Sequence, residues 1–340
     1  MTHSIRERIE ARERATLSPH AALAAESEGR EIEEPEDPVR TCFQRDRDRI
    51  LHSKSFRRLK GKTQVFIDPA GDHIRTRMTH TLEVAQISRT IGRALNLNED
   101  LIEAIALGHD VGHTPFGHAG EAALDAAIRE LGAADGPTGF HHDEQSLRLV
   151  QVLEHLNLCR ETCLGIGGHS KGQRDLTALD GIPSSTLEAA VVRTSDRIAY
   201  MNHDLDDALR AGVIGVIPER FHLAPTNAKR IGVMVVDVIE NSQDGPAIRF
   251  SPEMLAIMNE LKDWLFENVY LSYPDTHPDT LKAQAIVREL FLHFAVPGRL
   301  PDGFSGTQGA VDYVSGMTDR FAIETFAALR LPQAFRNVGE

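Results

Sequence analysis

Apolar residues recur at helical spacing along almost the whole of this 340-residue chain, and this pattern restricts the fold more than any other feature. Strand patterns are scarce, and no internal repeat or low-complexity tract is present. A helix over residues 79–95 collects its apolar side chains on one face: Val84, Ile87, Ile91 and Ala94. We therefore predict an all-α protein, folded as a compact helical bundle with a C-terminal helical lobe.

Helix boundaries follow from the same pattern and from capping residues. Asn98 suits an N-cap because two acidic residues occupy the first turn after it. Residues 63–68 and 72–77 alternate weakly, so they predict at most a small β-hairpin around 69–71. Further helices are expected over 101–110, 120–131, 143–156, 186–212, 227–242, 252–270, 279–294 and 309–329.

The charge distribution divides the chain. Residues 26–37 hold seven acids and one arginine, whereas residues 40–62 hold nine Lys/Arg against two Asp. The second segment needs either an anionic partner or a solvated face. The net charge of −13 disfavours a general nucleic-acid binder. We predict a flexible acidic segment over 1–38, a core over 39–225 and a C-terminal helical region over 226–340 that packs on the core.

The sequence favours a cytoplasmic location without membrane contact. No apolar run reaches the ~18 residues of a membrane span. The first twenty residues are too charged for a secretory signal. Three cysteines cannot all pair, and Cys159 and Cys163, one helical turn apart, are either metal ligands or small buried side chains.

The stretch GHDVGHTPFGHAGE, residues 108–121, concentrates three histidines and two acids within fourteen residues. His80 lies on the apolar face of the preceding helix, and Asp196 begins a helical stripe that continues with Tyr200 and Asp204. Each feature alone has an ordinary explanation: a hydrogen-bonded core histidine, a helix C-cap at His109-Asp110, and a solvated face. Apolar neighbours on both sides of the stripe argue against the solvated face.

Taken together, these residues predict a metal site where three helices cross. His80, His109, Asp110 and Asp196 provide two imidazole nitrogens and two carboxylates, a ligand set for one divalent ion per subunit. Hard or borderline ions suit this set, so Mn²⁺, Mg²⁺ or Fe²⁺ is expected. Four protein ligands on a six-coordinate ion leave two positions for water and substrate.

At this point the chain resembles a known family. The order His…His-Asp…Asp is the signature of HD-domain metal-dependent phosphohydrolases. Longer motifs between about Arg40 and Phe326 are similar, in the right order, to the deoxynucleoside triphosphate triphosphohydrolase (dGTPase-like) family, shorter bacterial subfamily. These motifs are RDRDRILHSKSFRRLKGKTQVF, TRMTHTLEVAQISR, HDVGHTPFGHAGE, FHHDEQSLR, DRIAYMNHDLDDA and DYVSGMTDRFA.

The resemblance implies a role for each matching residue. His118 and Glu121 correspond to the catalytic pair, in which the carboxylate orients the imidazole. Tyr200 matches a tyrosine against the deoxyribose, where it disfavours a 2′-OH, and Asp204 matches the acceptor for the 3′-OH. Residues that match phosphate, substrate or base contacts are Arg77, His113, His142, Arg197 and Gln64.

The resemblance also implies an activity: hydrolysis of a dNTP, dGTP or a broader set, to a deoxynucleoside and inorganic triphosphate. Relatives are homo-oligomers and often need an activating dNTP at a second site. Single-stranded DNA is a further candidate partner. One alternative is another HD-domain nucleotide phosphohydrolase or phosphodiesterase. It is disfavoured because residues 111–114 lack the Glu-Asp pair of alarmone hydrolases. The other alternative is a non-catalytic nucleotide-sensing or DNA-binding relative. It is disfavoured because every predicted metal ligand, together with His118 and Glu121, is present in the sequence.

Overall fold

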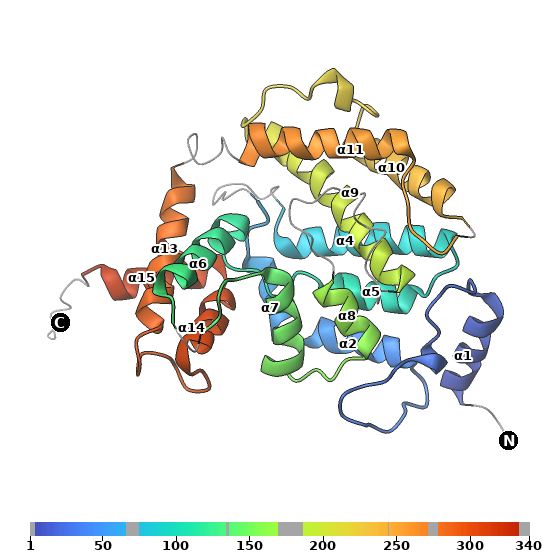
Figure 1. Ribbon diagram of the computed structural model, residues 1–340, viewed down its shortest axis with the longest axis horizontal. Helices are drawn as coiled ribbons and strands as arrows, with labels where there is room; N and C mark the ends of the chain where they lie inside the picture. Colours follow the sequence, from blue (N-terminus) through green and yellow to red (C-terminus); the bar gives the residue numbers. More distant parts are fainter. Residues whose placement is uncertain are drawn as a thin grey trace, which may run out of the picture.

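The computed structural model describes residues 4–65, 75–133, 136–168, 186–243, 245–270 and 278–332, and within these ranges every regular element is a helix (Figure 1). The prediction of an all-α protein is confirmed. Thr63 and Thr76, one from each arm of the predicted hairpin, form an isolated antiparallel bridge. Residues 66–74, the middle of that hairpin, lie outside the described residues.

Helix α5 (Glu99–Gly108) lies at the centre of the larger apolar core. Asn98 caps it as predicted, since its side chain accepts hydrogen bonds from the amides of Asp100 and Leu101. Its alanine- and isoleucine-rich surface is buried on most sides, so neighbouring helices pack around it. These neighbours are α2 (Cys42–His52), α4 (Arg77–Ala94), α8 (Arg160–Gly167) and α9 (Leu187–Arg210).

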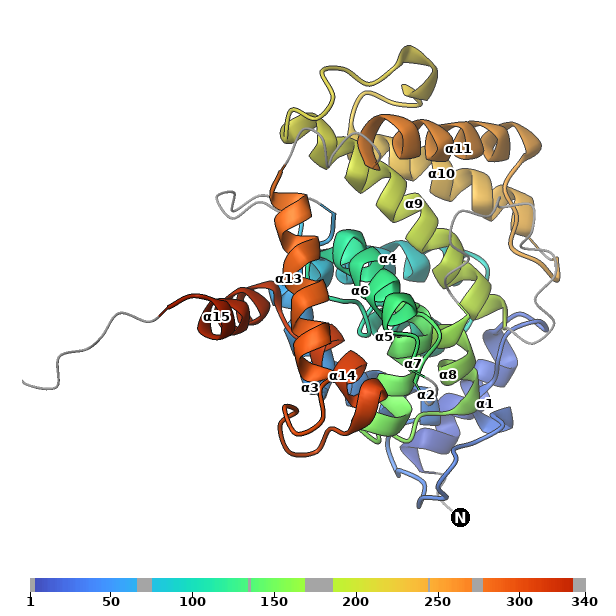
Figure 2. The same ribbon diagram turned by 60° about the vertical axis from the view of Figure 1, so that its left-hand side comes forward.

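A smaller apolar core joins α6 to the C-terminal part of the chain (Figure 2). It contains α6 (Gly117–Leu131), α13 (Asp279–Phe294), α14 (Gly306–Ser315) and α15 (Asp319–Arg330). In contrast, α10 (Asn227–Ser242) and α11 (Pro252–Leu265) belong to the larger core. The two cores therefore do not follow the predicted boundary between residues 225 and 226.

The predicted helix over 309–329 is two helices in the structure. α14 ends at Ser315, and Thr318 then caps α15 by accepting a hydrogen bond from the amide of Phe321. Threonine favours such a cap because its hydroxyl satisfies an amide that has no partner inside the helix. Apolar spacing alone could not reveal this break, since the pattern continues across it.

The sequence predicts a flexible segment over 1–38, but the structure differs. α1 (Ile5–Thr16) begins with a capping box at Ser4, and the following chain packs on the core. The amides of Ala22 and Asn98 donate to the same Glu188 carboxylate oxygen, each at 3.0 Å. Arg30 pairs with the buried Asp46. Carboxylates of this segment are also held, as in the ion pairs of Glu34 with Arg45 and Arg49. Composition by itself does not distinguish such pairing from flexibility.

Short elements complete the described chain. α3 (Lys54–Arg58) and the 3-10 turn Leu59–Gly61 lead toward the bridge at Thr63. No helix in the described ranges has both the length and the apolar character needed to cross a membrane. The remaining elements are η1 (Ala24–Glu26), α7 (His142–Arg148), the π-helical turn Leu149–Leu153, η5 (Glu219–Phe221) and the π-helical turn Phe266–Tyr270.

Candidate metal centre and catalytic turn

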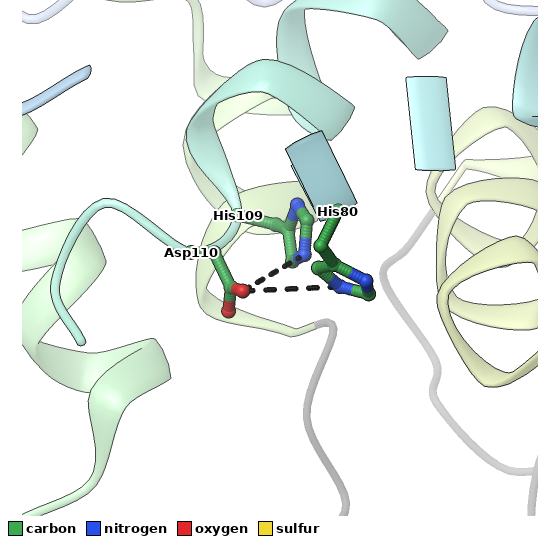
Figure 3. A group of neighbouring side chains, drawn as sticks. All are labelled: His80, His109 and Asp110. Atoms are coloured by element: carbon green, nitrogen blue, oxygen red, sulfur yellow. Dashed lines mark ion pairs between the residues drawn. The ribbon is translucent and has the colours of Figure 1, made fainter. Parts of the chain in front are cut away.

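The four residues predicted as metal ligands come together from three helices. Asp196 Oδ1, on α9, is 3.0 Å from His80 Nε2 on α4 and 3.9 Å from His109 Nε2. Asp110 Oδ2, two residues beyond the end of α5, lies 3.9 Å from His80 Nε2 and 3.6 Å from His109 Nε2. Figure 3 shows the two rings and the Asp110 carboxylate converging on one point. We call these four residues the His/Asp cluster.

Neighbouring groups fix the orientation and charge of this cluster. His109 Nδ1 lies 2.7 Å from the carbonyl of Ala106, so it donates there and leaves Nε2 as the acceptor nitrogen directed at the carboxylates. Arg77 donates to Asp110 Oδ2 at 2.7 Å. Burial opposes ionisation of Asp110, but Arg77 and the nearby histidines outweigh it and hold its pKa well below the ordinary value.

The donor set fits a divalent cation. His80, His109 and Asp110 each offer a ligand atom, and these atoms lie within 4.8 Å of one another. Burial raises the pKa of Asp196, yet the hydrogen bond with His80 prevails and lowers it, so both carboxylates are ionised at neutral pH. Two imidazole nitrogens with two carboxylates are ligands typical of Mn²⁺, Fe²⁺ or Zn²⁺ sites, and Mg²⁺ accepts the oxygens.

Residues 111–116, here called the catalytic turn, connect the His/Asp cluster to α6. Phe116 adopts the left-handed conformation at φ 62°, which a bulky residue rarely does. Gly117 follows at φ 59°, and a Cβ there would lie 2.6 Å from the carbonyl oxygen of Gln64. A Cβ on Gly112 would lie 2.2 Å from the amide nitrogen of Ser146. The glycines therefore let the turn press against two backbone segments.

A second group of ionisable side chains gathers around this turn. Glu121 Oε1 accepts from the backbone amide of His142 at 3.0 Å and lies 2.9 Å from its ring Nδ1. Glu121 Oε2 lies 3.5 Å from His118 Nδ1 and 3.8 Å from His113 Nε2. The rings of His113 and His142 stack with centroids 4.1 Å apart. We call His113, His118, Glu121 and His142 the turn cluster.

Charge interactions give the turn-cluster residues different protonation states. Burial opposes a charged His142, but Glu121 outweighs burial and raises the pKa of His142 to about 9. Burial, together with Arg77 and His142, lowers the pKa of His113 well below its ordinary value. His113 is therefore neutral and His142 protonated at neutral pH. His118 is largely exposed, with 61% of its side chain accessible, so it is the most solvent-exposed side chain of this cluster.

The stripe on α9 faces the same region. Asp204 accepts a hydrogen bond from the hydroxyl of Tyr270, and burial raises the pKa of Asp204 to about 6 although this bond opposes the shift. Tyr200 accepts a hydrogen bond from Arg197 at 2.8 Å. Arg197 thus contacts Tyr200, which lies one helical turn after Asp196.

The other residues predicted to contact the substrate differ in burial and in hydrogen-bond partners. Arg77 is 1% exposed, and besides Asp110 it donates to the carbonyl oxygen of Gln64 at 3.0 Å. Gln64 is itself buried, and its side-chain oxygen has no hydrogen-bond partner among the described residues. His142 contacts Glu121 in the turn cluster, whereas the adjacent His141 is exposed.

Three residues near these clusters were missed in the sequence. Lys62 is buried beside His113, Asp319 bonds the catalytic turn, and Tyr270 bonds Asp204. Asp319 lies inside the DYVSGMTDRFA motif, so that motif was a signal for it. Nothing distinguishes Lys62 from the other cations of its segment, and Tyr270 ends an ordinary amphipathic helix.

The fold and the His/Asp cluster place this chain among HD-domain proteins: the HD domain family matches residues 77–201, the segment that carries all four cluster residues. A phosphohydrolase-associated domain family matches residues 248–328.

Similar proteins identify the family within the HD-domain proteins. A deoxyguanosinetriphosphate triphosphohydrolase-like protein of Caldanaerobacter subterraneus is 48% identical, over 96% of each chain. Proteins of the same name from Desulfatibacillum aliphaticivorans and Clostridium perfringens are 45% and 41% identical, over 97% of this chain and 99% and 98% of theirs. The chain belongs to the family of deoxyguanosinetriphosphate triphosphohydrolase-like proteins.

Proposed function

We propose that this protein is a metal-dependent dNTP triphosphohydrolase, which cleaves dGTP or a broader set of dNTPs to deoxynucleoside and inorganic triphosphate. The names of the relatives support this activity. The observation that carries it is the arrangement of two adjoining clusters, with Asp110 Oδ2 directed at the His/Asp cluster and Oδ1 3.9 Å from His113 Nε2. A metal site and a proton-handling site thus share one carboxylate.

His80, His109, Asp110 and Asp196 would hold one divalent ion per subunit, and Mn²⁺, Mg²⁺ or Fe²⁺ suits these ligands. When bound, such an ion supplies Lewis-acid polarisation of a phosphate oxygen and a more acidic water. The protein's part is to keep both carboxylates ionised and the imidazole nitrogens correctly oriented. The low pKa of Asp110 and the bond from His109 to Ala106 support this assignment.

The proposed reaction joins a water oxygen to the α-phosphorus and breaks the bond from that phosphorus to O5′. His118 is positioned to move the proton either from the water or to O5′, since its ring is exposed and Glu121 holds Nδ1. Glu121 in turn is fixed by two hydrogen bonds to His142. The β- and γ-phosphates stay bonded to the α-phosphate and are released with it as inorganic triphosphate, so they contribute only to binding.

The remaining residues would contact the substrate. We propose that Asp204 accepts from the 3′-OH and that Tyr200 fills the space a 2′-OH needs. Both follow Asp196 on one stripe of α9, which supports a sugar placed beside the metal. His113, His142 and Arg197 are proposed phosphate contacts, and Gln64 a base contact. Arg77 matches a phosphate contact as well, although in this structure its guanidinium holds Asp110.

We extend the proposal to assembly and regulation. A homo-oligomer is supported by exposed apolar side chains at the C-terminal end: Phe321, Ile323, Leu329 and Leu331. Single-stranded DNA contact is supported by exposed cations for which the described residues offer no ion pair: Lys54, Arg57, Arg58 and Lys60. Free thiols at all three cysteines fit a cytoplasmic location. An activating dNTP at a second site rests on the resemblance alone.

Product analysis tests the activity directly. The purified protein is incubated with Mn²⁺ and each dNTP, and phosphorus NMR identifies the anion released. We expect inorganic triphosphate and deoxynucleoside, and no turnover by Asp196→Ala. Release of pyrophosphate or orthophosphate, or activity only on an alarmone or a cyclic nucleotide, would replace the proposal with another HD-domain hydrolase. Nucleotide binding without any product under these conditions would instead indicate a non-catalytic sensor.

A further inference from the structure

The catalytic turn is bound by a carboxylate from near the far end of the chain. Asp319, the first residue of α15, accepts from the backbone amide of Phe116 through Oδ1 at 2.9 Å. Its Oδ2 accepts from the amide of Thr63 at 2.9 Å and from the Thr63 hydroxyl at 2.6 Å. One side chain therefore ties the catalytic turn and the segment before the Thr63–Thr76 bridge to the smaller core.

Lys62 makes a second connection among the same elements. Its side chain is buried, and Nζ donates to the carbonyl oxygen of His113 and, at 2.9 Å, to that of Ser315 at the end of α14. Burial, together with Arg77 and Arg58, lowers the pKa of Lys62 to about 7. Burying a lysine side chain costs free energy, and the hydrogen bonds to the two carbonyl oxygens offset part of that cost.

The catalytic turn needs such support because its backbone is strained. Phe116 holds φ 62° although a bulky side chain disfavours that conformation, and such residues persist only where their surroundings hold them. The turn also sets geometry on both of its sides. His113 lies within it, and α6, which carries His118 and Glu121, starts directly after it.

We propose that Asp319 and Lys62 are positioning residues for the hydrolysis, which hold the catalytic turn so that His113 and His118 keep their places around Glu121. Neither side chain touches the His/Asp cluster in the structure, so their effect on the reaction passes through the turn. This inference rests on the proposed function for its kinetic readout. It gives the helices α14 and α15 a part in the chemistry although their own residues lie outside both clusters.

The weak apolar anchoring of α15 makes this role separable from packing. Ala322 is its one buried residue, and the apolar side chains Phe321 and Ile323 are exposed. Replacing Asp319 should therefore loosen the turn without emptying a core. The matched control is Glu324→Gln, the same chemical change on the same helix, where the carboxylate pairs only with the exposed Arg320. For Lys62→Met the control is Lys229→Met, the same chemical change at an exposed position on α10.

Steady-state kinetics with Mn²⁺ and dGTP give the first test. We expect Asp319→Asn and Lys62→Met to lower kcat by roughly 10- to 100-fold, the loss expected for hydrogen bonds to charged groups. KM and the bound metal content should stay within about twofold of their wild-type values. The loss of one hydrogen bond to a charged group would change them by more. Both controls should match wild type. Unchanged kcat, a rise in KM with normal kcat, or loss of metal would each overturn the proposal.

Amide hydrogen exchange gives a readout that does not depend on activity. Peptides covering 108–121 should exchange roughly tenfold faster in Asp319→Asn than in Glu324→Gln. If wild type does not cleave dNTPs but this difference is found, the proposed function fails and the positioning of the turn stands. Equal exchange in both variants rejects positioning whatever the activity.

A milder substitution covers the case in which Asp319→Asn or Lys62→Met does not fold. Thr63→Val removes only the 2.6 Å hydroxyl bond to Asp319, whereas Thr63→Ser keeps it. We expect a several-fold lower kcat for Thr63→Val and near wild-type kcat for Thr63→Ser, since one neutral donor is lost. Equal kcat in the two variants would overturn the proposal.

Discussion

The His/Asp cluster and the turn cluster share Asp110 as a neighbour, yet the structure supports them in different ways. The first is built from α4, α5 and α9, which all pack in the larger core. The second is built on a strained turn, on α6 of the smaller core, and on α7. The two clusters also hold the extremes of side-chain exposure, 0% for His109 and 61% for His118. Metal binding and proton transfer should therefore be separable by mutation.

Removing a metal ligand should give the largest effect and should act on the first cluster alone. Asp196→Ala deletes the one metal ligand that we propose on α9. We expect loss of bound Mn²⁺ by elemental analysis and at least about a 10³-fold loss of kcat, because metal polarisation supplies several kcal/mol of transition-state stabilisation. Asp206→Ala is the control, since Asp206 lies on the same helix but pairs with Arg75 and Arg210. Full metal content in Asp196→Ala would show that the ligand set is wrong.

Removing His118 should do the reverse and spare the metal. His118→Ala should lower kcat by roughly 10²–10⁴, the range for general acid–base groups, with Mn²⁺ stoichiometry near wild type. The exposed His141 provides the control variant, His141→Ala. The comparison between the clusters breaks down if His118→Ala releases the metal while substrate still binds.

The helical stripe on α9 tests a third, sugar-side position with a smaller effect. Asp204→Ala should reduce kcat/KM by roughly 10- to 150-fold, because a charge-assisted hydrogen bond to the 3′-OH is worth about 1.5–3 kcal/mol. A 3′-deoxy substrate should lose a similar factor on wild type and little more on the variant. Additive losses would mean that Asp204 does not contact the 3′-OH.

Asp204 also predicts a pH dependence. Burial raises its pKa to about 6, so the carboxylate proposed to accept from the 3′-OH becomes protonated as pH falls through that value. We expect kcat/KM to decline below about pH 6 in wild type. In Asp204→Asn this acidic limb, the decline of kcat/KM below about pH 6, should be absent from the pH–rate profile measured between pH 5 and 8. A limb that persists unchanged in the variant would assign it to another group.

The smallest expected effect concerns stability within the turn cluster. The pKa of His142 is raised to about 9 from an ordinary 6.5, so the pair with Glu121 stabilises the fold fully below pH 6.5. This contribution is lost as pH rises through 9. Urea unfolding of metal-free protein should show about 1–3 kcal/mol less stability at pH 9.5 than at pH 6 from this pair. His142→Gln should flatten that slope, and His141→Gln should keep it.

Much of this architecture was predictable because it depends on the helical periodicity and spacing of apolar residues in the sequence. The apolar face through Val84 and Ile91 placed His80 in the core, and the predicted helix over 227–242 matches α10. Pairing across long sequence distances was not predictable. Lys62 and Asp319 meet the catalytic turn from positions about 50 and 200 residues away, and neither residue's burial nor its partner follows from local pattern.

The predicted flexibility of residues 1–38 was misleading for a related reason. An acidic, proline-containing stretch has the composition of a disordered segment. Its carboxylates instead form ion pairs: Glu34 with Arg45 and Arg49 of α2, Glu26 with Arg14, and Glu36 with Arg6. Arg45 and Arg49 belong to the predicted basic segment, so part of its charge is balanced by the acidic segment. Composition gives the charges of the two segments, whereas only the fold shows which of them pair.

The carboxylate of Glu188, which receives the amides of Ala22 and Asn98, has a consequence for the order in which the chain folds during synthesis. Residues 22 and 98 leave the ribosome well before residue 188 is translated. At typical elongation rates the ninety residues between positions 98 and 188 take on the order of 5–20 seconds. The N-terminal segment is thus made first but can complete its docking only after α9 begins to emerge.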